Sequence, residues 1–195
     1  NVGKMDHLAC FVPGMLALGG GRLSRYDVDT AVEERYMDVA KGLADTCYQM
    51  YAKSPTKVAP ESVTFSKYSV SINTGMDLTQ FPHNFLRPET VESLYILHRR
   101  TGDPKYRDQA WEIFQAFERV TKVDSGGYSG LRNVNSKSTS GDSHPSQYMD
   151  NTQQSFFLAE TLKYLFLIFS SSEVLPLHMW VFNTEAHPIR VHCQR

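Results

Sequence analysis

The stretch Phe85-Leu86-Arg87-Pro88-Glu89-Thr90-Val91-Glu92-Ser93 places an arginine, a proline and two glutamates close together. Pro88 is well placed as the first residue of a helix, because its missing N–H would have no partner there. Glu89 and Glu92 then lie three residues apart in the first turn and share one helix face. The positive end of the helix dipole and the neighbouring Arg87 both favour ionised carboxylates.

Two interpretations of this acidic first turn are open. Ionised carboxylates held side by side suit a general base or the surroundings of a hard cation. Acidic residues are also common in the first turn of ordinary helices, where they only stabilise the helix. The stretch alone favours the second interpretation, so the rest of the chain has to decide between them.

Composition limits the class of protein. The chain has 195 residues, enough to bury a core and typical of one domain. Its net charge of −1 provides no basic surface field for nucleic acid or an anionic membrane. With 12% aromatic residues and the carboxylates above, a polymeric ligand is expected to be neutral, such as carbohydrate. The chain starts without methionine or a signal peptide, which suggests a fragment of a longer protein.

Helices dominate the predicted organisation. Apolar residues at helical spacing predict helices at residues 13–18 (ended by Gly19-Gly20-Gly21), 29–52, 88–101, 104–121 and 152–169. The apolar stripe of the fourth of these is predicted to be Tyr106, Ala110, Trp111, Phe114 and Phe117. Residues 58–85 are strand-like and predict a β-hairpin or long loop projecting from the helical body. The tight turn Gly102-Asp103-Pro104 makes its flanking helices an antiparallel hairpin, and the whole fits an all-α toroid.

Glu160 lies in the predicted helix 152–169, which is apolar nearly all round and is therefore expected to be buried. A buried glutamate has to be paired, to lie near a metal or to face a cavity, because burying an isolated charge is costly. Lys163, three residues further on, is the ordinary alternative as its partner. Glu160 is therefore a candidate site residue.

Two further positions have both a functional and a structural interpretation. Thr184, in the polar segment Phe182-Asn183-Thr184-Glu185-Ala186-His187-Pro188, offers hydroxyl and main-chain oxygens that one calcium ion could use together. The same segment could equally be a hydrogen-bonded turn before a proline. His7 could line a pocket or could be a hydrogen-bonded structural histidine.

The chain contains three cysteines, Cys10, Cys47 and Cys193. The odd count leaves at least one without an intramolecular partner, and three pairings or three free thiols are possible. No Cys-x-x-Cys spacing occurs, which argues against a zinc or redox motif.

Several motifs together resemble a known family. They are His7-Leu8-Ala9-Cys10-Phe11-Val12-Pro13-Gly14, Leu86-Arg87-Pro88-Glu89-Thr90-Val91-Glu92-Ser93, Gly127-Tyr128-Ser129-Gly130-Leu131, Gln153-Gln154-Ser155-Phe156-Phe157-Leu158-Ala159-Glu160-Thr161-Leu162-Lys163-Tyr164 and Trp180-Val181-Phe182-Asn183-Thr184-Glu185-Ala186-His187-Pro188. In this order they resemble the class I α1,2-mannosidases, glycoside hydrolase family 47, over nearly the whole chain. The resemblance implies an (α/α)7 barrel whose axial cleft holds a mannose and Ca2+. Residues 1–195 would be the C-terminal portion of that catalytic domain, with a small β-hairpin insertion.

The resemblance also implies roles for individual residues. Glu89 would be the general base, and Thr184 would bind Ca2+ through its hydroxyl and carbonyl oxygens. The other site residues would be Glu92, Glu160 and Glu185 around the ion's waters or the sugar hydroxyls, Phe156 stacked on the mannose, and Arg87 and His7 lining the cleft. Cys10 and Cys47 would form the family's disulfide, with Cys193 left unpaired.

The implied reaction is the inverting hydrolysis of terminal α1,2-linked mannose from high-mannose N-glycans on glycoproteins. The general acid would belong to N-terminal hairpins that precede these residues, so none is assigned, and the isolated fragment is expected to be inactive or poorly folded. The parent protein would act in the lumen of the endoplasmic reticulum or the Golgi, attached to the membrane only through an anchor outside this chain. Residues 90–93 lean towards the endoplasmic reticulum type, and Gln153-Gln154 leans towards the Golgi or plant type.

Two alternatives remain at this point. One is a degradation-enhancing, mannosidase-like glycan-binding protein of the endoplasmic reticulum, against which the cysteine pair Cys10 and Cys47 argues. The other is a helical scaffold without a site, which would need neither Glu160 in an apolar helix nor Thr184-Glu185.

Overall fold

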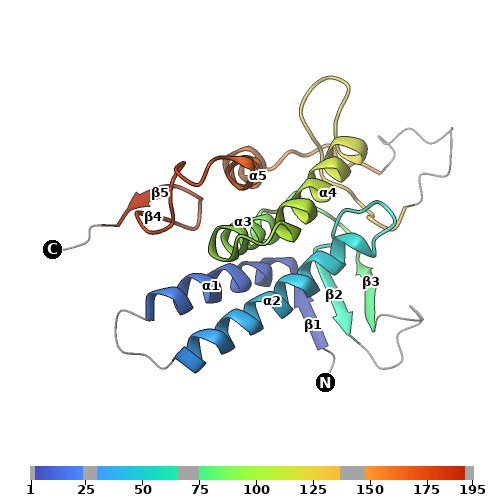
Figure 1. The fold of residues 1–195 in the computed structure, drawn as a ribbon. Coiled ribbons are helices and arrows are strands. Elements are labelled where there is room, and N and C mark those ends of the chain that lie inside the picture. The colour runs from blue at the N-terminus through green and yellow to red at the C-terminus, as the bar shows by residue number, and fades with distance from the viewer. Residues whose placement is uncertain (1–2, 24–29, 66–74, 137–147, 192–195) are drawn as a thin grey trace.

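The computed structural model describes residues 3–23, 30–65, 75–136 and 148–191. Helices dominate these residues, as the sequence predicts (Figure 1). In chain order the elements are β1 (Gly3–Asp6), the 3-10 helix η1 (His7–Phe11), α1 (Val12–Leu23), α2 (Thr30–Ala52), β2 (Ser62–Phe65), β3 (Met76–Phe81), α3 (Glu89–Thr101), α4 (Lys105–Val120), the π-helical turn η4 (Phe157–Thr161), α5 (Leu162–Phe169), β4 (Trp180–Phe182) and β5 (Pro188–Arg190).

Helix α3 is the centre of the molecule. It contacts α1, α2, α4 and α5 (Figure 1), and its residues from Ser93 to Leu97 are all buried. Gly102 ends the helix in the left-handed conformation, with φ of 71°. Helix α4 then packs back on α3, which confirms the predicted helical hairpin. Because Glu89 opens this helix, the acidic first turn is held on a rigid element.

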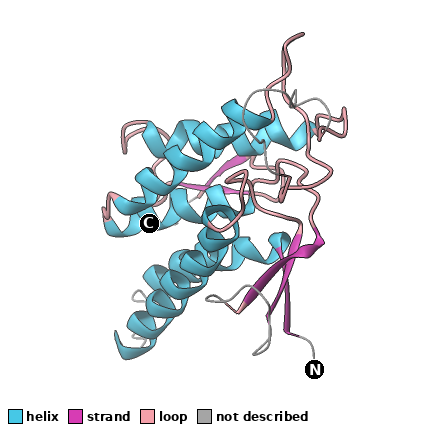
Figure 2. Cartoon of the chain, turned by 90° about the vertical axis from the view of Figure 1, so that its right-hand side faces the viewer, coloured by secondary structure: helices cyan, strands magenta, loops and turns pink. Residues whose placement is uncertain are grey.

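A three-stranded antiparallel sheet, in the order β1-β2-β3, projects to one side of the helices (Figure 2). Strands β2 and β3 confirm the predicted hairpin, although residues 66–74 lie outside the described part of the chain. Strand β1 was not predicted from the sequence; it pairs with β2 from Gly3 opposite Phe65 to Asp6 opposite Ser62. This pairing fixes the chain immediately before His7.

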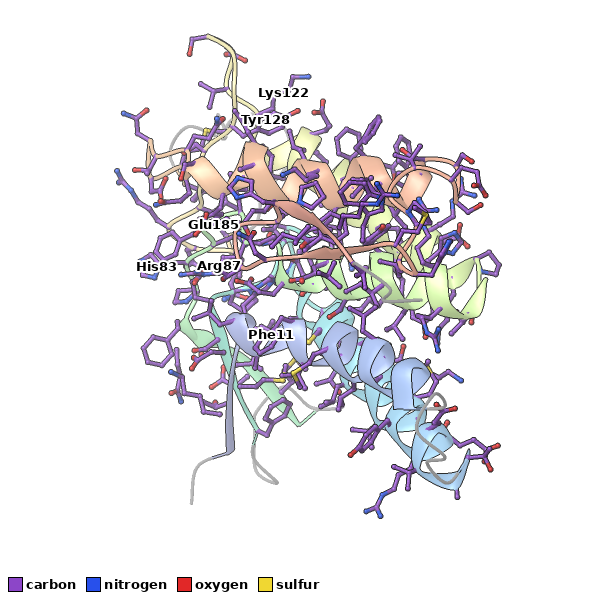
Figure 3. All side chains as sticks on the ribbon, turned by 90° about the vertical axis from the view of Figure 1, so that its left-hand side faces the viewer. Phe11, His83, Arg87, Lys122, Tyr128 and Glu185 are labelled. Atoms are coloured by element: carbon purple, nitrogen blue, oxygen red, sulfur yellow. A yellow bond between two sulfur atoms is a disulfide. The ribbon has the colours of Figure 1, made fainter. Side chains whose placement is uncertain are left out.

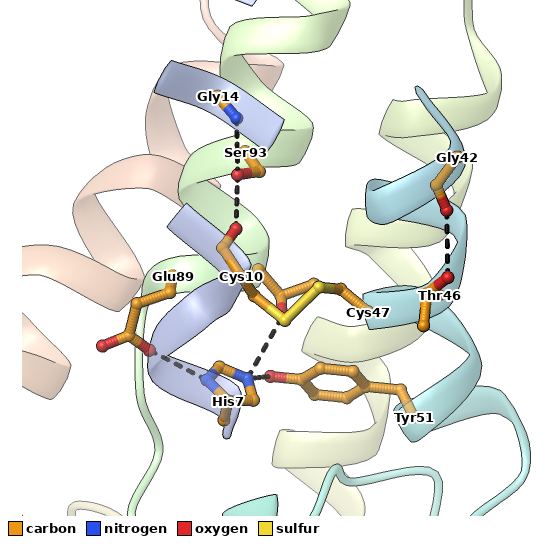
Figure 4. Close-up of a disulfide and its surroundings, with 10 residues drawn as sticks. His7, Cys10, Gly14, Gly42, Thr46, Cys47, Tyr51, Glu89 and Ser93 are labelled. Carbon is orange, nitrogen blue, oxygen red and sulfur yellow. Dashed lines mark hydrogen bonds and ion pairs between the residues drawn. A yellow bond between two sulfur atoms is a disulfide. The ribbon is translucent and has the colours of Figure 1, made fainter. Parts of the chain in front are cut away.

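A disulfide between Cys10 and Cys47 joins η1 to α2, with an S–S distance of 2.10 Å (Figure 4). This bond confirms the pairing implied by the family resemblance. Both cysteines are buried in the hydrophobic core. In the chain-entropy model, a disulfide that closes a loop of this size stabilises the folded state by about 3–4 kcal/mol. Cys193 lies outside the described residues.

Helix α1 corrects one prediction, because it does not end at Gly19 but continues to Leu23. A Cβ added at Gly20 would lie 3.6 Å from the carbonyl oxygen of Glu33 in α2. The absence of a side chain lets α1 and α2 approach closely, and their packing outweighs the low helix propensity of glycine.

Helix α4 corrects a second prediction. Ala110, Ile113 and Phe117 are buried as part of its inner face, but Trp111 is 47% exposed. Trp111 instead packs at the surface against Phe114 and Phe169. One residue along a helix rotates a side chain by roughly 100°, so Trp111 lies on the flank of the face that Ala110 buries.

The last predicted helix differs most from its expectation. Helical structure begins at residue 155 rather than 152, and it includes the π-helical turn η4. One face packs on α3 and α4, whereas Leu158 and Phe166 on the other face are 59% and 67% exposed. The helix is therefore not buried all round in this part of the protein. None of the described helices has the length and apolar character needed to cross a membrane.

Candidate functional site

The site is built around Glu89 at the start of α3. Nδ1 of His7 lies 2.8 Å from Oε2 of Glu89 (Figure 4). His7 is 1% exposed, and the Glu89 side chain is 12% exposed. Because a carboxylate only accepts hydrogen bonds, Nδ1 is the donor. The imidazole therefore fixes one oxygen of Glu89.

Two hydroxyl groups complete the surroundings of His7. Its Nε2 lies 2.8 Å from the hydroxyl of Tyr51 and 3.1 Å from that of Thr90. Burial and the negative charge of Glu89 raise the pKa of Tyr51, so this phenol stays protonated and can donate. The interpretation of His7 as a buried, hydrogen-bonded histidine is therefore confirmed, and the same side chain touches the candidate base, whereas its lining of a pocket stays a prediction.

Glu92 lies one turn after Glu89 and is held in a less polar environment. Burial and the neighbouring charge of Glu89 raise the pKa of Glu92 to about 7. The hydroxyl of Tyr164, in α5, lies 3.4 Å from Oε1 of Glu92 and partly opposes this rise. The two acidic side chains share one face, as their spacing predicts, but the ionised form of Glu92 is less favoured than the helix-dipole argument predicts, because burial and the charge of Glu89 outweigh the dipole.

Glu160 joins the same group of carboxylates from η4. It is 8% exposed. Burial, followed by the charges of Glu185 and Glu89, raises the pKa of Glu160 to about 7. Single π-helical turns of this kind occur often at functional sites.

Lys163 does not neutralise Glu160 by a direct ion pair within the described residues. Its ammonium donates instead to the carbonyl oxygen of Ala186, at 2.9 Å, and only moderates the pKa of Glu160. This bond ties α5 to the turn between β4 and β5. The structural alternative for Glu160, a direct ion pair with Lys163, is therefore not formed.

The β4–β5 hairpin carries Thr184 and Glu185 in its turn. Oδ1 of Asn183 accepts hydrogen bonds from the backbone N–H groups of Glu185, at 3.0 Å, and His187, at 2.8 Å. The hydrogen-bonded turn expected as the structural alternative is thus present. Thr184 is exposed at its tip, which leaves its hydroxyl and carbonyl oxygens accessible. Figure 3 shows Glu185 towards the same edge of the molecule as Arg87.

Arg87 lies between two phenylalanine rings and is anchored by a carboxylate. Its guanidinium carbon is 5.8 Å from the centre of the Phe85 ring and 5.6 Å from that of Phe156. Its Nε donates to Oε2 of Glu61 at 2.6 Å. Neither Glu61 nor Tyr51 was predicted from the sequence to be part of the site. A carboxylate directly after the buried run Val58-Ala59-Pro60 was the available signal for Glu61.

The donor set determines how a metal ion could be held. Among the described residues, no three His, Cys, Asp or Glu side chains come together as a direct metal-binding cluster. The charges of Glu89 and Glu160 nevertheless help to raise the pKa of Glu92, and those of Glu185 and Glu89 help to raise the pKa of Glu160. A hard cation bound to oxygen atoms and water near them would relieve this repulsion. The residues therefore fit an ion held by Thr184 and by waters rather than by a carboxylate cage.

The described fold is a set of helical hairpins with carboxylates gathered where the helices begin, as expected for part of an α/α barrel. A sequence profile described as glycosyl hydrolase family 47 matches residues 1–191, and the chain belongs to this family. It is structurally similar to an α-1,2-mannosidase from Trichoderma reesei, with a TM-score of 0.81 and 31% identity. That match covers 97% of this chain and 39% of the other.

Curated relatives agree with this assignment. The chain is 48% identical over 191 residues to the mannosyl-oligosaccharide 1,2-alpha-mannosidase MNS1 of Arabidopsis thaliana, covering 97% of this chain and 30% of the relative. It is 46% identical over 190 residues to the endoplasmic reticulum mannosyl-oligosaccharide 1,2-alpha-mannosidase of Homo sapiens, covering 96% and 25%. The chain thus spans between a quarter and a third of the length of these relatives.

Proposed function

We propose that these residues form the part of an α1,2-mannosidase that carries the general base and the calcium-binding segment. The whole protein would hydrolyse terminal α1,2-linked mannose from high-mannose N-glycans. The observation that carries this proposal is the contact of the buried His7 with Glu89, within a group of coupled carboxylates. The names of the mannosidase relatives give the substrate class.

Glu89 is suited to the role of base because His7 orients it through one carboxylate oxygen, so that the other could accept a proton from water. In an inverting glycosidase, the base activates water on the face of the sugar opposite to the general acid. No acid is assigned within this chain. Phe156 would stack on the mannose ring, while Arg87 and Glu185 would bind its hydroxyl groups.

Ca2+ is the proposed cofactor. Thr184 would hold it through its hydroxyl and carbonyl oxygens, with Glu92, Glu160 and Glu185 binding its waters. When bound, the ion would lower the pKa of a coordinated water and offset the repulsion among the carboxylates.

The proposed location is the lumen of the endoplasmic reticulum or the Golgi. The human and mouse relatives are named as endoplasmic reticulum enzymes. A disulfide in the hydrophobic core also favours an oxidising compartment.

The test uses the full-length protein and a high-mannose oligosaccharide with terminal α1,2-linked mannose. We expect free mannose to be released first as the β-anomer, which proton NMR detects directly. Glu89→Gln should lower kcat by about a hundredfold or more while oligosaccharide binding persists. An inactive wild-type protein, or a fully active Glu89→Gln variant, would refute the proposal.

A further inference from the structure

Four side chains form a continuous row that leads outward from the candidate site. The guanidinium of Arg87 lies between the rings of Phe156 and Phe85, at 5.6 and 5.8 Å. The imidazole of His83 stacks on Phe85, with ring centres 6.3 Å apart and planes inclined by 27°. His83 is exposed, and Phe85 and Phe156 are half-buried. Figure 3 shows His83 and Arg87 at the same edge of the molecule.

The backbone that carries this row is fixed at successive residues. The carbonyl of His83 accepts from the N–H of Glu61 at 2.8 Å, and the N–H of Phe85 donates to the Glu61 carboxylate at 3.1 Å. Oδ1 of Asn84 accepts from the N–H of Leu86 at 2.9 Å, and the carbonyl of Leu86 accepts from the Thr161 hydroxyl at 2.7 Å. The rings are therefore presented by a rigid segment, which reduces the entropy lost when a ligand binds.

We propose that Phe85 and His83 bind a sugar residue of the oligosaccharide beyond the cleaved mannose and its immediate neighbour, and so favour substrates longer than a disaccharide. This inference rests on the proposed function and extends it. Within the described residues only Nε of Arg87 is hydrogen-bonded to protein, which leaves its two terminal nitrogens for sugar hydroxyls. Flat rings beside such donors suit the C–H face of a pyranose, since apolar walls with few polar groups are typical of ligand sites.

The row could instead serve only to shield the Arg87–Glu61 ion pair from water. That role would require Phe85 and Phe156, which flank the guanidinium. It would not require His83, whose exposed ring lies on Phe85 rather than on Arg87. The extension of the row beyond the ion pair therefore favours a binding surface.

The test compares two substrates with the full-length protein, a high-mannose oligosaccharide and α1,2-linked mannobiose. His83→Ala should lower kcat/KM for the oligosaccharide about fivefold or more and change that for mannobiose less than about twofold. Phe85→Ala, whose ring also contacts Arg87, should lower kcat/KM more for the oligosaccharide than for mannobiose. Phe85→Trp, which keeps a flat ring, should retain the preference. Phe81→Ala, at an exposed phenylalanine in β3, is the matched control and should leave both values unchanged.

Equal losses on both substrates would show a structural role, and unchanged values would show no role; either result overturns the inference. If the wild-type protein cleaves neither substrate, the proposed function fails. Calorimetry then measures the affinity for the intact oligosaccharide and tests sugar binding by His83 and Phe85 independently of catalysis. Weaker binding by His83→Ala would then support the binding surface, and unchanged affinity would overturn it.

Discussion

His7 and Glu89 are 82 residues apart in the chain, yet Nδ1 of the imidazole lies 2.8 Å from a carboxylate oxygen. Two long-range links produce this contact. Strand β1 pairs with β2 directly before His7, and the disulfide at Cys10 fixes the chain directly after it. The hydroxyl of Ser93 in α3 adds a third link by donating to the carbonyl of Cys10. The orientation of the candidate base is thus enforced by covalent and hydrogen-bonded supports from three elements.

Replacing His7 by alanine should impair both activity and stability. The variant leaves the buried hydroxyl of Tyr51 without this partner and frees the Glu89 carboxylate to rotate. We expect the free energy of unfolding to fall by about 1–3 kcal/mol and kcat to fall about tenfold or more. Tyr51→Phe is the control, because it removes the hydroxyl but leaves the bond to Glu89. It should cost stability with a smaller loss of kcat, and equal losses of kcat would argue against orientation by His7.

Removing the disulfide should destabilise the protein without removing any group of the candidate site. Cys10→Ala/Cys47→Ala should lower the free energy of unfolding by about 3–4 kcal/mol. The measurement is chemical denaturation of wild type and variant, with and without a reductant. Reductant should lower the stability of wild type towards that of the double variant and leave the variant unchanged. A reductant effect of the same size on both proteins would contradict this prediction.

The hydroxyl of Thr161, in η4, should help to hold the backbone just before Arg87 in position. Its hydroxyl donates to the carbonyl of Leu86, a leucine with φ of 61°, immediately before Arg87. Thr161→Val keeps the shape but removes this bond, and should lower the free energy of unfolding by about 1–2 kcal/mol and raise KM. Thr101→Val is the matched control, because the hydroxyl of the exposed Thr101 donates to the carbonyl of Leu97 within its own helix. Comparable effects of the two substitutions would exclude a specific role for the Leu86 contact.

The sequence predicts the parts of the site that depend on local patterns. The places of Glu89 and Glu92 follow from a helix start, and their shared face follows from three-residue spacing, whereas the raised pKa of Glu92 depends on burial. The hairpin of α3 and α4 follows from one tight turn. The choice of Glu160 as a candidate site residue also follows from a single acidic residue in an apolar helix, but its position beside Glu185 and Glu89 depends on tertiary packing.

The features that were not predictable depend on tertiary packing. Nothing local marks β1 as a strand, because its pairing partner lies about sixty residues away in the chain. Gly20 would end an isolated helix, but here it allows close contact with α2. Glu61 was missed because its role appears only when Arg87 lies beside it. Lys163 was the structural alternative as a partner of Glu160, but the β4–β5 turn offers its ammonium a carbonyl instead.

The stability of the protein should depend on pH through Glu92 and Glu160. Both have a pKa raised from 4.5 to about 7, so the folded state binds more protons than the unfolded state between these values. Their contribution is therefore complete below about pH 4.5 and is lost as the pH rises towards 7. Glu160→Gln, which cannot ionise, should be more stable than wild type at pH 8 and similar to it at pH 4. Urea denaturation at both values measures this difference, and equal stability at pH 8 would contradict it.

Binding of Ca2+ at the proposed site should reverse the loss of stability that ionisation of Glu92 and Glu160 causes at high pH. In the absence of divalent ions at pH 8, wild type carries repelling carboxylates around Glu160 and Glu185. Ca2+ bound nearby favours their ionised forms and stabilises only the folded state, so at a hundredfold excess over Kd it should add about 2.7 kcal/mol. Thr184→Val removes one proposed oxygen ligand and should shift the calcium titration of the melting temperature to higher concentration. Thr79→Val, in the exposed part of β3, is the control and should titrate like wild type. Identical calcium titrations of wild type and Thr184→Val would rule out Thr184 as a ligand through its hydroxyl, whereas a shift confined to Thr184→Val would locate the ion at the β4–β5 turn.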